Sequence, residues 1–148
     1  EGTFASGYAV GRGPGPAYPL PLADDQEFVY PIAQYDHDEG NAVGGGFVYR
    51  GRAIPELQGK YVFADFPRGR LLTIESSLIP TEQTLEISEL RLMIDGREQE
   101  LVDVAGFPNT YGPGDRVDLR LGMDSVGELY LLTKGDGWVR KLVPTGSR

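Results

Sequence analysis

The segment from Asn41 to Glu75 most constrains the fold, because it places three strand-like runs in succession without a helical pattern between them. The runs Val43–Arg50, Lys60–Phe66 and Arg70–Glu75 are rich in β-branched and aromatic residues and are bounded by glycine and proline. Such runs predict β-strands, and Pro67–Gly69 predicts a hairpin between the last two. Since both alternating faces of the Lys60–Phe66 run are largely apolar, we expect a sheet that is covered on two sides.

The segment from Leu121 to Pro144 repeats this organisation near the end of the chain. Three further strands are predicted at about Val117–Met123, Glu128–Thr133 and Trp138–Val143, joined by short turns that contain glycine. Another hairpin is predicted where Asp95-Gly96-Arg97 separates two apolar runs, Ile87–Ile94 and Glu98–Val102. No segment shows a helical period. Consecutive antiparallel units of this kind are typical of the blades of a β-propeller.

Length limits how much of a propeller this chain can contain. A four-stranded blade takes roughly 40 to 50 residues, and rings usually need at least about four blades. The 148 residues therefore correspond to two or three blades, and the last predicted unit has three strands where a blade needs four. We expect the chain to be the C-terminal part of a larger propeller, preceded by further polypeptide upstream of Glu1, or to complete its sheet edges with another protein chain.

Two regions are predicted within the chain. Residues 1–26 form an irregular arm rich in glycine and proline, which lacks the backbone donors that the interior of a sheet requires. Residues 27–148 form the propeller blades. At the boundary, Phe28–Tyr35 is a plausible strand, although Pro31 would place it at a sheet edge or break it.

Charge and composition exclude several classes of function. A formal net charge of −8 with scattered lysine and arginine argues against nucleic-acid binding, which needs a clustered basic surface. The absence of cysteine excludes disulfides and thiolate metal sites. No apolar run approaches the roughly 18 residues of a membrane span.

Several polar residues are candidates for a site, each with a structural alternative. His37 is the single histidine and lies between two aspartates, which suits a general acid or base, but it also suits an exposed turn. The oxygen-bearing side chains around it have the hard-ligand chemistry that calcium prefers, but they do not follow EF-hand spacing, so a solvated acidic turn is favoured. These side chains belong to Asp36, Asp38, Glu39 and Asn41.

Three arginines and the aromatic residues complete the set of candidates. Arg50, Arg68 and Arg70 carry guanidinium groups that bind carboxylates, but an ion pair of Arg50 with Asp65 across strands is the favoured structural alternative. Stacking on a sugar or a quinone is conceivable for the aromatic rings, but we expect them to lie in the core. These rings belong to Trp138, Tyr61, Phe63 and Phe66.

The quoted segments resemble the glucose/sorbosone dehydrogenase family. The run YDHDEGNAVGGGFVYRGRAIPELQGKYVFADFPRGRLLTIE is similar to the late-blade signature of that family, roughly a His and a Gly, then GG-x-VYRG, P-x-L-x-G-x-Y-x-F-x-D and G-R-L. The closing run LGMDSVGELYLLTKGDGWVRKLV resembles the family's final blade, written FGEDxxGELYxL with a short strand after it. Hedgehog-interacting-protein-like extracellular proteins share this pattern.

This resemblance implies an all-β, six-bladed propeller of antiparallel four-stranded blades, in a periplasmic or extracellular protein. It further implies that pyrroloquinoline quinone (PQQ) and calcium lie on the propeller axis, where a sugar is oxidised by hydride transfer to the quinone with a His base. That base and most quinone contacts belong to earlier blades, so this chain alone is not expected to be catalytically competent and carries no catalytic residue.

The resemblance also assigns cofactor-binding residues to this chain. In the soluble sugar dehydrogenases, the strand that enters the last blade carries two arginines, spaced by one residue, that meet the carboxylates of the cofactor. Residues 115–118 read Asp-Arg-Val-Asp here, so Arg116 takes one of these roles and an acid stands near the other. Arg50 of the VYRG element is the second candidate. Two functions remain open, part of a PQQ-dependent sugar oxidoreductase and a non-catalytic binding or assembly subunit of an envelope or extracellular complex.

Overall fold

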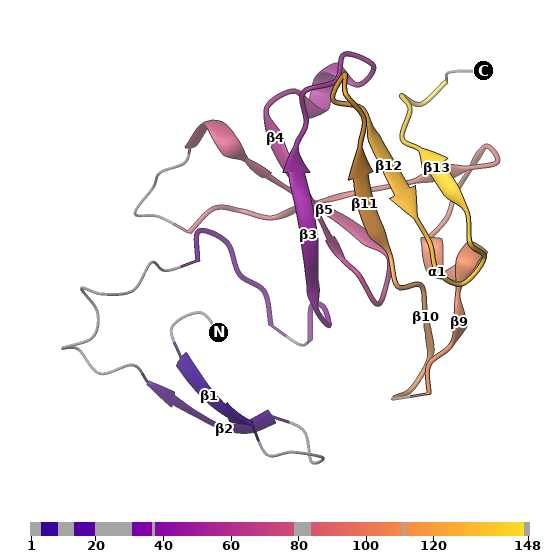
Figure 1. Cartoon of the computed structure of the whole chain (residues 1–148). Coiled ribbons are helices and arrows are strands. Elements are labelled where there is room, and N and C mark those ends of the chain that lie inside the picture. Colours follow the sequence, from indigo (N-terminus) through magenta and orange to yellow (C-terminus); the bar gives the residue numbers. More distant parts are fainter. Residues whose placement is uncertain are drawn as a thin grey trace.

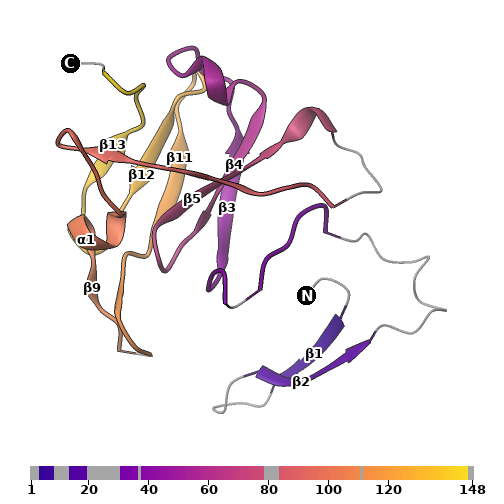
Figure 2. The same cartoon turned by 180° about the vertical axis from the view of Figure 1, so that it is seen from behind.

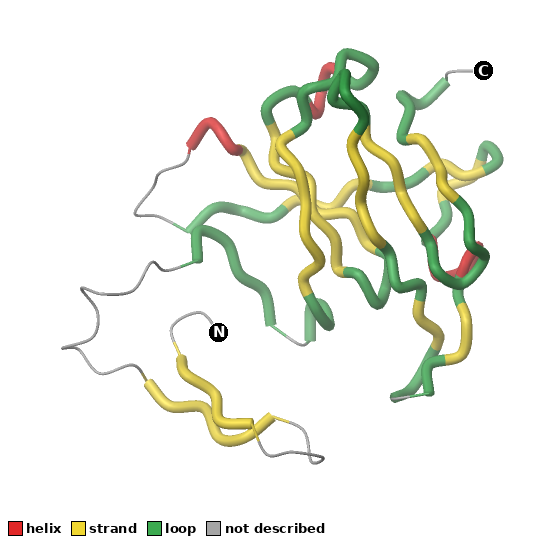
Figure 3. Tube along the Cα trace, viewed as in Figure 1, coloured by secondary structure: helices red, strands yellow, loops and turns green. Residues whose placement is uncertain are grey.

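The computed structural model describes residues 4–8, 14–19, 31–36, 38–78, 84–110 and 112–146. Its described part is built mainly from antiparallel strands in sheets of two to four strands, so the prediction of an all-β chain is confirmed (Figures 1 and 3). These sheets remain separate and open, and they do not close into a ring. In the described residues, no helix has both the length and the apolar character needed to cross a membrane.

The elements follow one another in this order: β1 (Phe4–Tyr8), β2 (Pro14–Pro19), β3 (Val43–Val48), η2 (Pro55–Leu57), β4 (Lys60–Asp65), β5 (Arg70–Glu75), η3 (Ser76–Leu78), β6 (Ser88–Leu90), β7 (Met93–Ile94), β8 (Arg97–Glu98), α1 (Leu101–Ala105), β9 (Phe107–Pro108), β10 (Asp115–Arg116), β11 (Arg120–Met123), β12 (Leu129–Leu132) and β13 (Val139–Lys141).

The largest sheet is an antiparallel meander in the order β3-β4-β5-β6. The hairpin predicted between β4 and β5 is present, with Asp65 opposite Arg70 and Lys60 opposite Glu75. Gly69 closes it at φ 75°, a conformation that side-chain-bearing residues rarely adopt, and its amide donates to the carbonyl of Asp65 at 2.9 Å.

The glycines of β3 let this strand approach β4 closely. The pairing register shifts between Gly44 and Phe47, which is the bend expected of a β-bulge. A Cβ atom on Gly46 would lie 2.1 Å from the carbonyl oxygen of Val62 and 2.8 Å from the Cα of Phe63. At Gly46 the backbone of β4 therefore lies where a side chain of β3 would otherwise be.

A second meander, β11-β12-β13, packs against the first. Strand β11 contacts β3, and both run in the same direction, as Figures 1 and 2 show from opposite sides. The main hydrophobic cluster joins the two sheets, and its largest fully buried members include Leu71 and Val62 from the first sheet and Leu129 from the second.

The other face of the four-stranded sheet is also covered. Phe63, Leu72 and Ile74 form a second cluster, against which Ile32 and Ile87 pack together with neighbouring partly buried side chains. The expectation of a sheet covered on both faces is therefore confirmed for β4 and β5. The alternating apolar residues of these strands supply the two faces, one for each cluster.

Four segments differ from the sequence prediction. Within the predicted irregular arm, β1 and β2 pair as an antiparallel two-stranded sheet. Residues 31–35 are not a strand, and the rest of the predicted Phe28–Tyr35 strand lies outside the described residues. The predicted run Ile87–Ile94 divides into β6, which pairs with β5, and β7, which pairs with β8 through the Asp95-Gly96 turn. The end of the predicted Glu98–Val102 strand is instead the start of α1.

Candidate functional site

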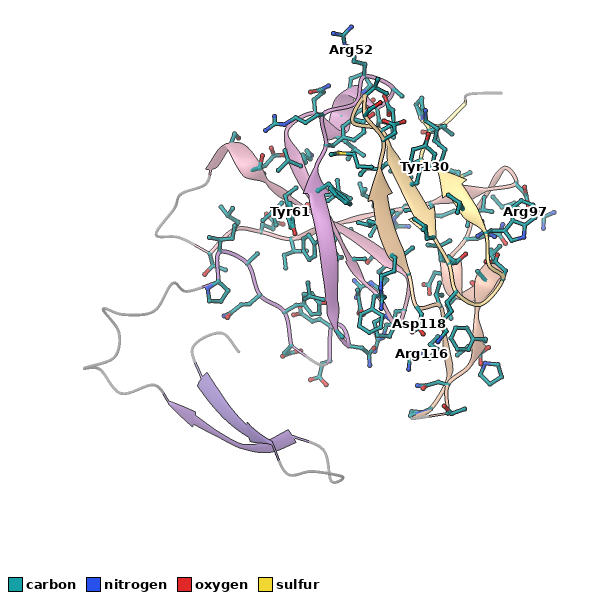
Figure 4. The ribbon with its side chains drawn as sticks, viewed as in Figure 1. Arg52, Tyr61, Arg97, Arg116, Asp118 and Tyr130 are labelled. Carbon is teal, nitrogen blue, oxygen red and sulfur yellow. The ribbon has the colours of Figure 1, made fainter. Side chains whose placement is uncertain are left out.

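The meander order gathers the polar loops at two opposite ends of the sheets. The arginine end consists of three segments: residues 36 and 38–41 before β3, Pro67–Gly69 between β4 and β5, and Asp115–Arg120, which runs from β10 into the start of β11. The Glu128 end consists of Arg50–Gly59 and Asp124–Glu128, which join β3 to β4 and β11 to β12. Figure 4 shows Arg116 and Asp118 at the first end and Arg52 at the second.

The two predicted cofactor residues, Arg50 and Arg116, therefore lie at opposite ends. Arg50 lies two residues after the end of β3, whereas Arg116 precedes β11, and these two strands run side by side in the same direction. The structure does not bring the two guanidinium groups together. One compact anion cannot be held by both of them in this arrangement.

Arg116 is tied to the aspartate two residues later. Its Nε and Nη2 lie 2.6 and 2.5 Å from Oδ1 of Asp118, and the two side chains are only 19% and 12% exposed. Lys134 places Nζ 3.5 Å from the other Asp118 oxygen. Asp118 adopts the left-handed backbone region at φ 54°, which explains why the strand predicted from Val117 begins only at Arg120. The charge of Arg116 is thus balanced within the chain.

Phe66 lies beneath the guanidinium groups of the arginine end. The Cζ of Arg120 is 4.6 Å from the centroid of the Phe66 ring, and the Cζ of Arg116 is 6.0 Å from it. Arg120 is exposed and donates to the carbonyl of Leu119 at 3.0 Å. Phe66 is half-buried and serves as a surface for cations, which differs from the core role expected for it.

Arg70 is part of an ion pair with Glu89 of β6. Its Nε and Nη2 donate to the two carboxylate oxygens at 2.9 and 2.7 Å, and its Nη1 donates to the carbonyl of Glu39. This pairing raises the pKa of Arg70 and lowers the pKa of Glu89. Arg70 therefore ties β5 to its neighbour and to the acidic turn, in a structural role.

A cavity of about 550 Å³ opens beside this pair. Its lining carries both signs of charge, with Arg68, Arg70 and Arg91 facing the cavity together with acidic residues of β6, β8 and α1. Arg91 pairs with Glu98 at 2.6 Å, and Arg68 donates to the Asn41 side chain at 2.6 Å. The cavity thus has a polar lining in which each of the three arginines already has a hydrogen-bond or ion-pair partner.

Two side-chain oxygens of the acidic turn accept hydrogen bonds from backbone amides of the same turn. Asp36 Oδ1 accepts from the amides of Asp38 and Glu39 at 2.9 and 3.3 Å, and Glu39 Oε2 accepts from the amide of Asp36 at 3.3 Å. His37 lies outside the described residues. Among the residues that are described, no group of three acidic or histidine side chains is placed to hold a metal ion.

Asp65 is fully buried and caps the chain that enters β3. Its carboxylate accepts from the amides of Asn41 and Ala42 at 2.9 and 3.3 Å. The predicted ion pair with Arg50 is wrong, because Arg50 is exposed at the opposite end of β3. Backbone amides, and not a cation, satisfy this buried carboxylate.

The Glu128 end contains a buried network that sequence reasoning missed. Tyr49, which is 0% exposed, donates its hydroxyl to Glu128 Oε2 at 2.6 Å and accepts from the amide of Ile54 at 3.0 Å. Glu128 Oε1 accepts from the amides of Arg52 and Ala53 at 2.8 and 3.1 Å. These bonds connect the loop after β3 with the strand β12 of the other sheet.

Hydrogen bonding sets the protonation states in this network. The bond from Tyr49 is the main cause that lowers the pKa of Glu128, and burial is the main cause that raises the pKa of Tyr49. The carboxylate stays ionised and the phenol stays protonated at neutral pH. The only sequence signal for this network was an acidic residue next to an otherwise apolar strand, directly after Gly127.

The other aromatic candidates divide between core and surface. Tyr61 and Phe63 stack with ring centroids 5.7 Å apart on one face of β4, and Phe63 is buried as expected. Trp138 is 64% exposed, so the core role expected for it is wrong.

No family model matches the chain in a search of known protein families.

Proposed function

We propose that this chain supplies two neighbouring blades of a β-propeller of the glucose/sorbosone dehydrogenase type. The observation that carries this proposal is the adjacency of β3 and β11, the first strands of two successive antiparallel meanders, which run in the same direction. Blades of a propeller have this relation, since the first strand of each one lines the central axis. The order β3-β4-β5-β6 corresponds to one complete four-stranded blade.

The second sheet supports the proposal because, in the described part of the chain, one of its edges and one of its apolar sides are uncovered. Among the described residues, its outer strand, β13, pairs on one side only, and the sheet has three strands where a blade has four. On the same side of this sheet, Leu132 and Val139 face each other across the ladder and are 38% and 59% exposed. We propose that the rest of the propeller, or another protein chain, covers this side and completes the edge.

The parent protein is proposed to oxidise sugars, with its reacting groups on blades outside this chain. A quinone with three carboxylates needs unpaired cations that converge on it, and the described residues do not meet this requirement. Arg116 is already paired with Asp118, and Arg50 lies at the other end of β3. Asp36 Oδ1 of the acidic turn is likewise engaged by two backbone amides. We therefore propose that other residues of the parent hold any PQQ or calcium.

Titration of the intact native protein with PQQ and calcium, followed by aldose-dependent dye reduction, tests this proposal. The expected result is quinone binding at micromolar concentration and sugar-dependent reduction of the dye, with an Arg116→Ala variant that keeps its quinone affinity within about twofold. Absence of binding at micromolar PQQ would remove the dehydrogenase function. A large loss of quinone affinity in Arg116→Ala would show that this chain does contact the cofactor.

The second candidate function is a non-catalytic binding or assembly subunit of an envelope or extracellular complex. It is favoured by the same two arginines, which do not converge, together with the uncovered side of the second sheet. This function would be supported if the intact protein does not bind PQQ and purifies from the periplasm or the medium in a stable complex with another protein.

A further inference from the structure

Trp138, the single tryptophan of the chain, presents its ring to solvent beside the β12–β13 turn. It is 64% exposed, and the guanidinium carbon of Arg140 lies over one face of the ring, 5.8 Å from its centroid. Neighbouring residues of a strand face opposite sides, so Arg140 lies on the other side of β13 from Val139, and the Trp138 ring lies next to Arg140. The ring is therefore separate from the uncovered side that we assign to a neighbouring blade.

The backbone of Trp138 and the side chain of Arg140 are held by several hydrogen bonds of the turn. The amide of Trp138 donates to Asp136 Oδ1 at 3.2 Å, and its carbonyl accepts from the amide of Thr133 at 3.1 Å. Arg140 is held in turn, because it donates to the Thr133 hydroxyl at 2.7 Å and to Asp136 Oδ2. Arg140 and Asp136 side chains are only 24% and 23% exposed. An aromatic ring and a planar group of donors are thus presented together on a turn that needs little reorganisation to bind.

The chemistry around the ring selects the class of ligand. Arg140 and Asp136 form an ion pair whose net charge is zero, which favours neither a cation nor an anion. The guanidinium has five N–H donors and uses two of them in these bonds. Asp136 Oδ1 already accepts from the Thr133 hydroxyl and the Trp138 amide, whereas Oδ2 accepts only from Arg140 and keeps one acceptor position. Hydroxyl groups both donate and accept, so a neutral polyol matches this border. The negative face of the indole ring attracts the slightly positive C–H groups of a flat apolar surface.

We propose that Trp138, with Arg140 over one face of its ring and Asp136 paired to that guanidinium, is a binding platform for a neutral pyranose unit of an oligosaccharide. The C–H face of the sugar ring stacks on the opposite face of the indole, and its hydroxyls bond past the edge of the ring to the guanidinium and the carboxylate. This platform requires neither a closed ring nor a quinone. It holds a carbohydrate without changing it.

Trp138 is the single tryptophan of these 148 residues, so the indole emission of this chain comes from the platform. In the parent protein, the difference between the native protein and its Trp138→Phe variant isolates the same signal. The intact chain is titrated with neutral glucose-, xylose- and N-acetylglucosamine-based oligosaccharides, and binding is measured by the emission of Trp138 and by calorimetry. We expect a solvent-exposed emission spectrum in the free chain, and a saturable change with at least one series. Trp138→Ala should weaken binding seen by calorimetry about tenfold or more, and Trp138→Phe less. Val126→Ala, at another exposed apolar residue, should have no effect.

Three results would overturn the platform. The first is an emission spectrum typical of a buried indole in the free chain. The second is that none of the oligosaccharides gives a saturable response. This result counts against the platform even if a proline-rich peptide, titrated in parallel, binds to Trp138. The third is binding that is unchanged in Trp138→Ala. Because no redox reaction is measured, failure of the dehydrogenase function leaves this test unaffected.

Discussion

Removing the hydroxyl of Tyr49 should weaken the connection between the two sheets and lower the free energy of unfolding of the chain. The substitution Tyr49→Phe keeps the ring and deletes the hydroxyl that donates to Glu128 and accepts from Ile54. Tyr49 is 0% exposed, so water does not replace these bonds without rearrangement. The loop after β3 would then lose one of its direct connections to β12.

The expected cost follows from the two bonds. A hydrogen bond to a charged group contributes about 1.5 to 3 kcal/mol, and a buried donor left without a partner costs about 1 to 3 kcal/mol. Since the phenylalanine ring still fills the site, we expect Tyr49→Phe to lower the free energy of unfolding by about 3 kcal/mol. With a urea m-value of about 2 kcal/mol/M, the unfolding midpoint should fall by about 1.5 M.

Tyr130→Phe provides the matched control for this change. Its hydroxyl donates to Asp124 at 3.1 Å from a half-buried position within one sheet, so its removal should cost under about 1 kcal/mol. Urea unfolding followed by circular dichroism measures both variants. Equal midpoints for Tyr49→Phe and Tyr130→Phe would refute the idea that a buried bond between the sheets contributes to stability.

The same substitution should change how stability depends on pH. In the folded chain the pKa of Glu128 is lowered, chiefly by the bond from Tyr49, relative to an unfolded value of about 4.3. A lowered folded pKa gives stability that is present above the unfolded pKa and is lost as the pH falls through the folded pKa. We therefore expect the difference between the native chain and Tyr49→Phe to be largest near pH 7 and to narrow as the pH falls below about 4.3. A difference that stays constant down to pH 2 would contradict this assignment.

Two further substitutions test local features of the fold. Gly127 has φ 87°, and an added Cβ would lie 2.7 Å from backbone atoms of Arg50 and Gly51, so Gly127→Ala should lower the free energy of unfolding by at least about 2 kcal/mol. Gly137→Ala, at φ 71° with open space around it, should lower it by only about 1 kcal/mol. Thermal unfolding measures both variants. Asp65→Asn keeps one acceptor oxygen and replaces the other with a donor that faces a backbone amide, so it should lower the free energy of unfolding by about 2 kcal/mol. Hydrogen exchange of the amides before β3 should become faster, and unchanged exchange would contradict the capping role of Asp65.

The strands were predictable because their side chains alternate and their turns contain glycine. The β4–β5 hairpin follows directly from two alternating runs around Pro67–Gly69. Helix α1 was missed because its five residues are too few to show a helical period, and Leu101 and Ala105 reveal their common side only when both are buried. The late start of β11 at Arg120 depends on the backbone of Asp118, which residue type does not indicate.

The candidate site was less predictable, since it depends on which loops share an end. A resemblance can assign Arg50 and Arg116 to one cofactor, but the direction of β3 and β11 places them apart. Asp65 and Glu128 are carboxylates satisfied by backbone amides, and a sequence shows neither burial nor those amides. The exposure of Trp138 was hinted at only by its place directly after the Gly135–Gly137 turn.

The most direct test of the propeller proposal is an experimental structure of the intact native protein, by crystallography or cryo-electron microscopy. We predict that β3 and β11 line a central axis as the first strands of neighbouring blades, and that another β-sheet covers the Leu132 and Val139 side of the last sheet. A structure in which the two meanders form a closed sandwich, with that side in solvent and no further blades beside it, would contradict the proposal.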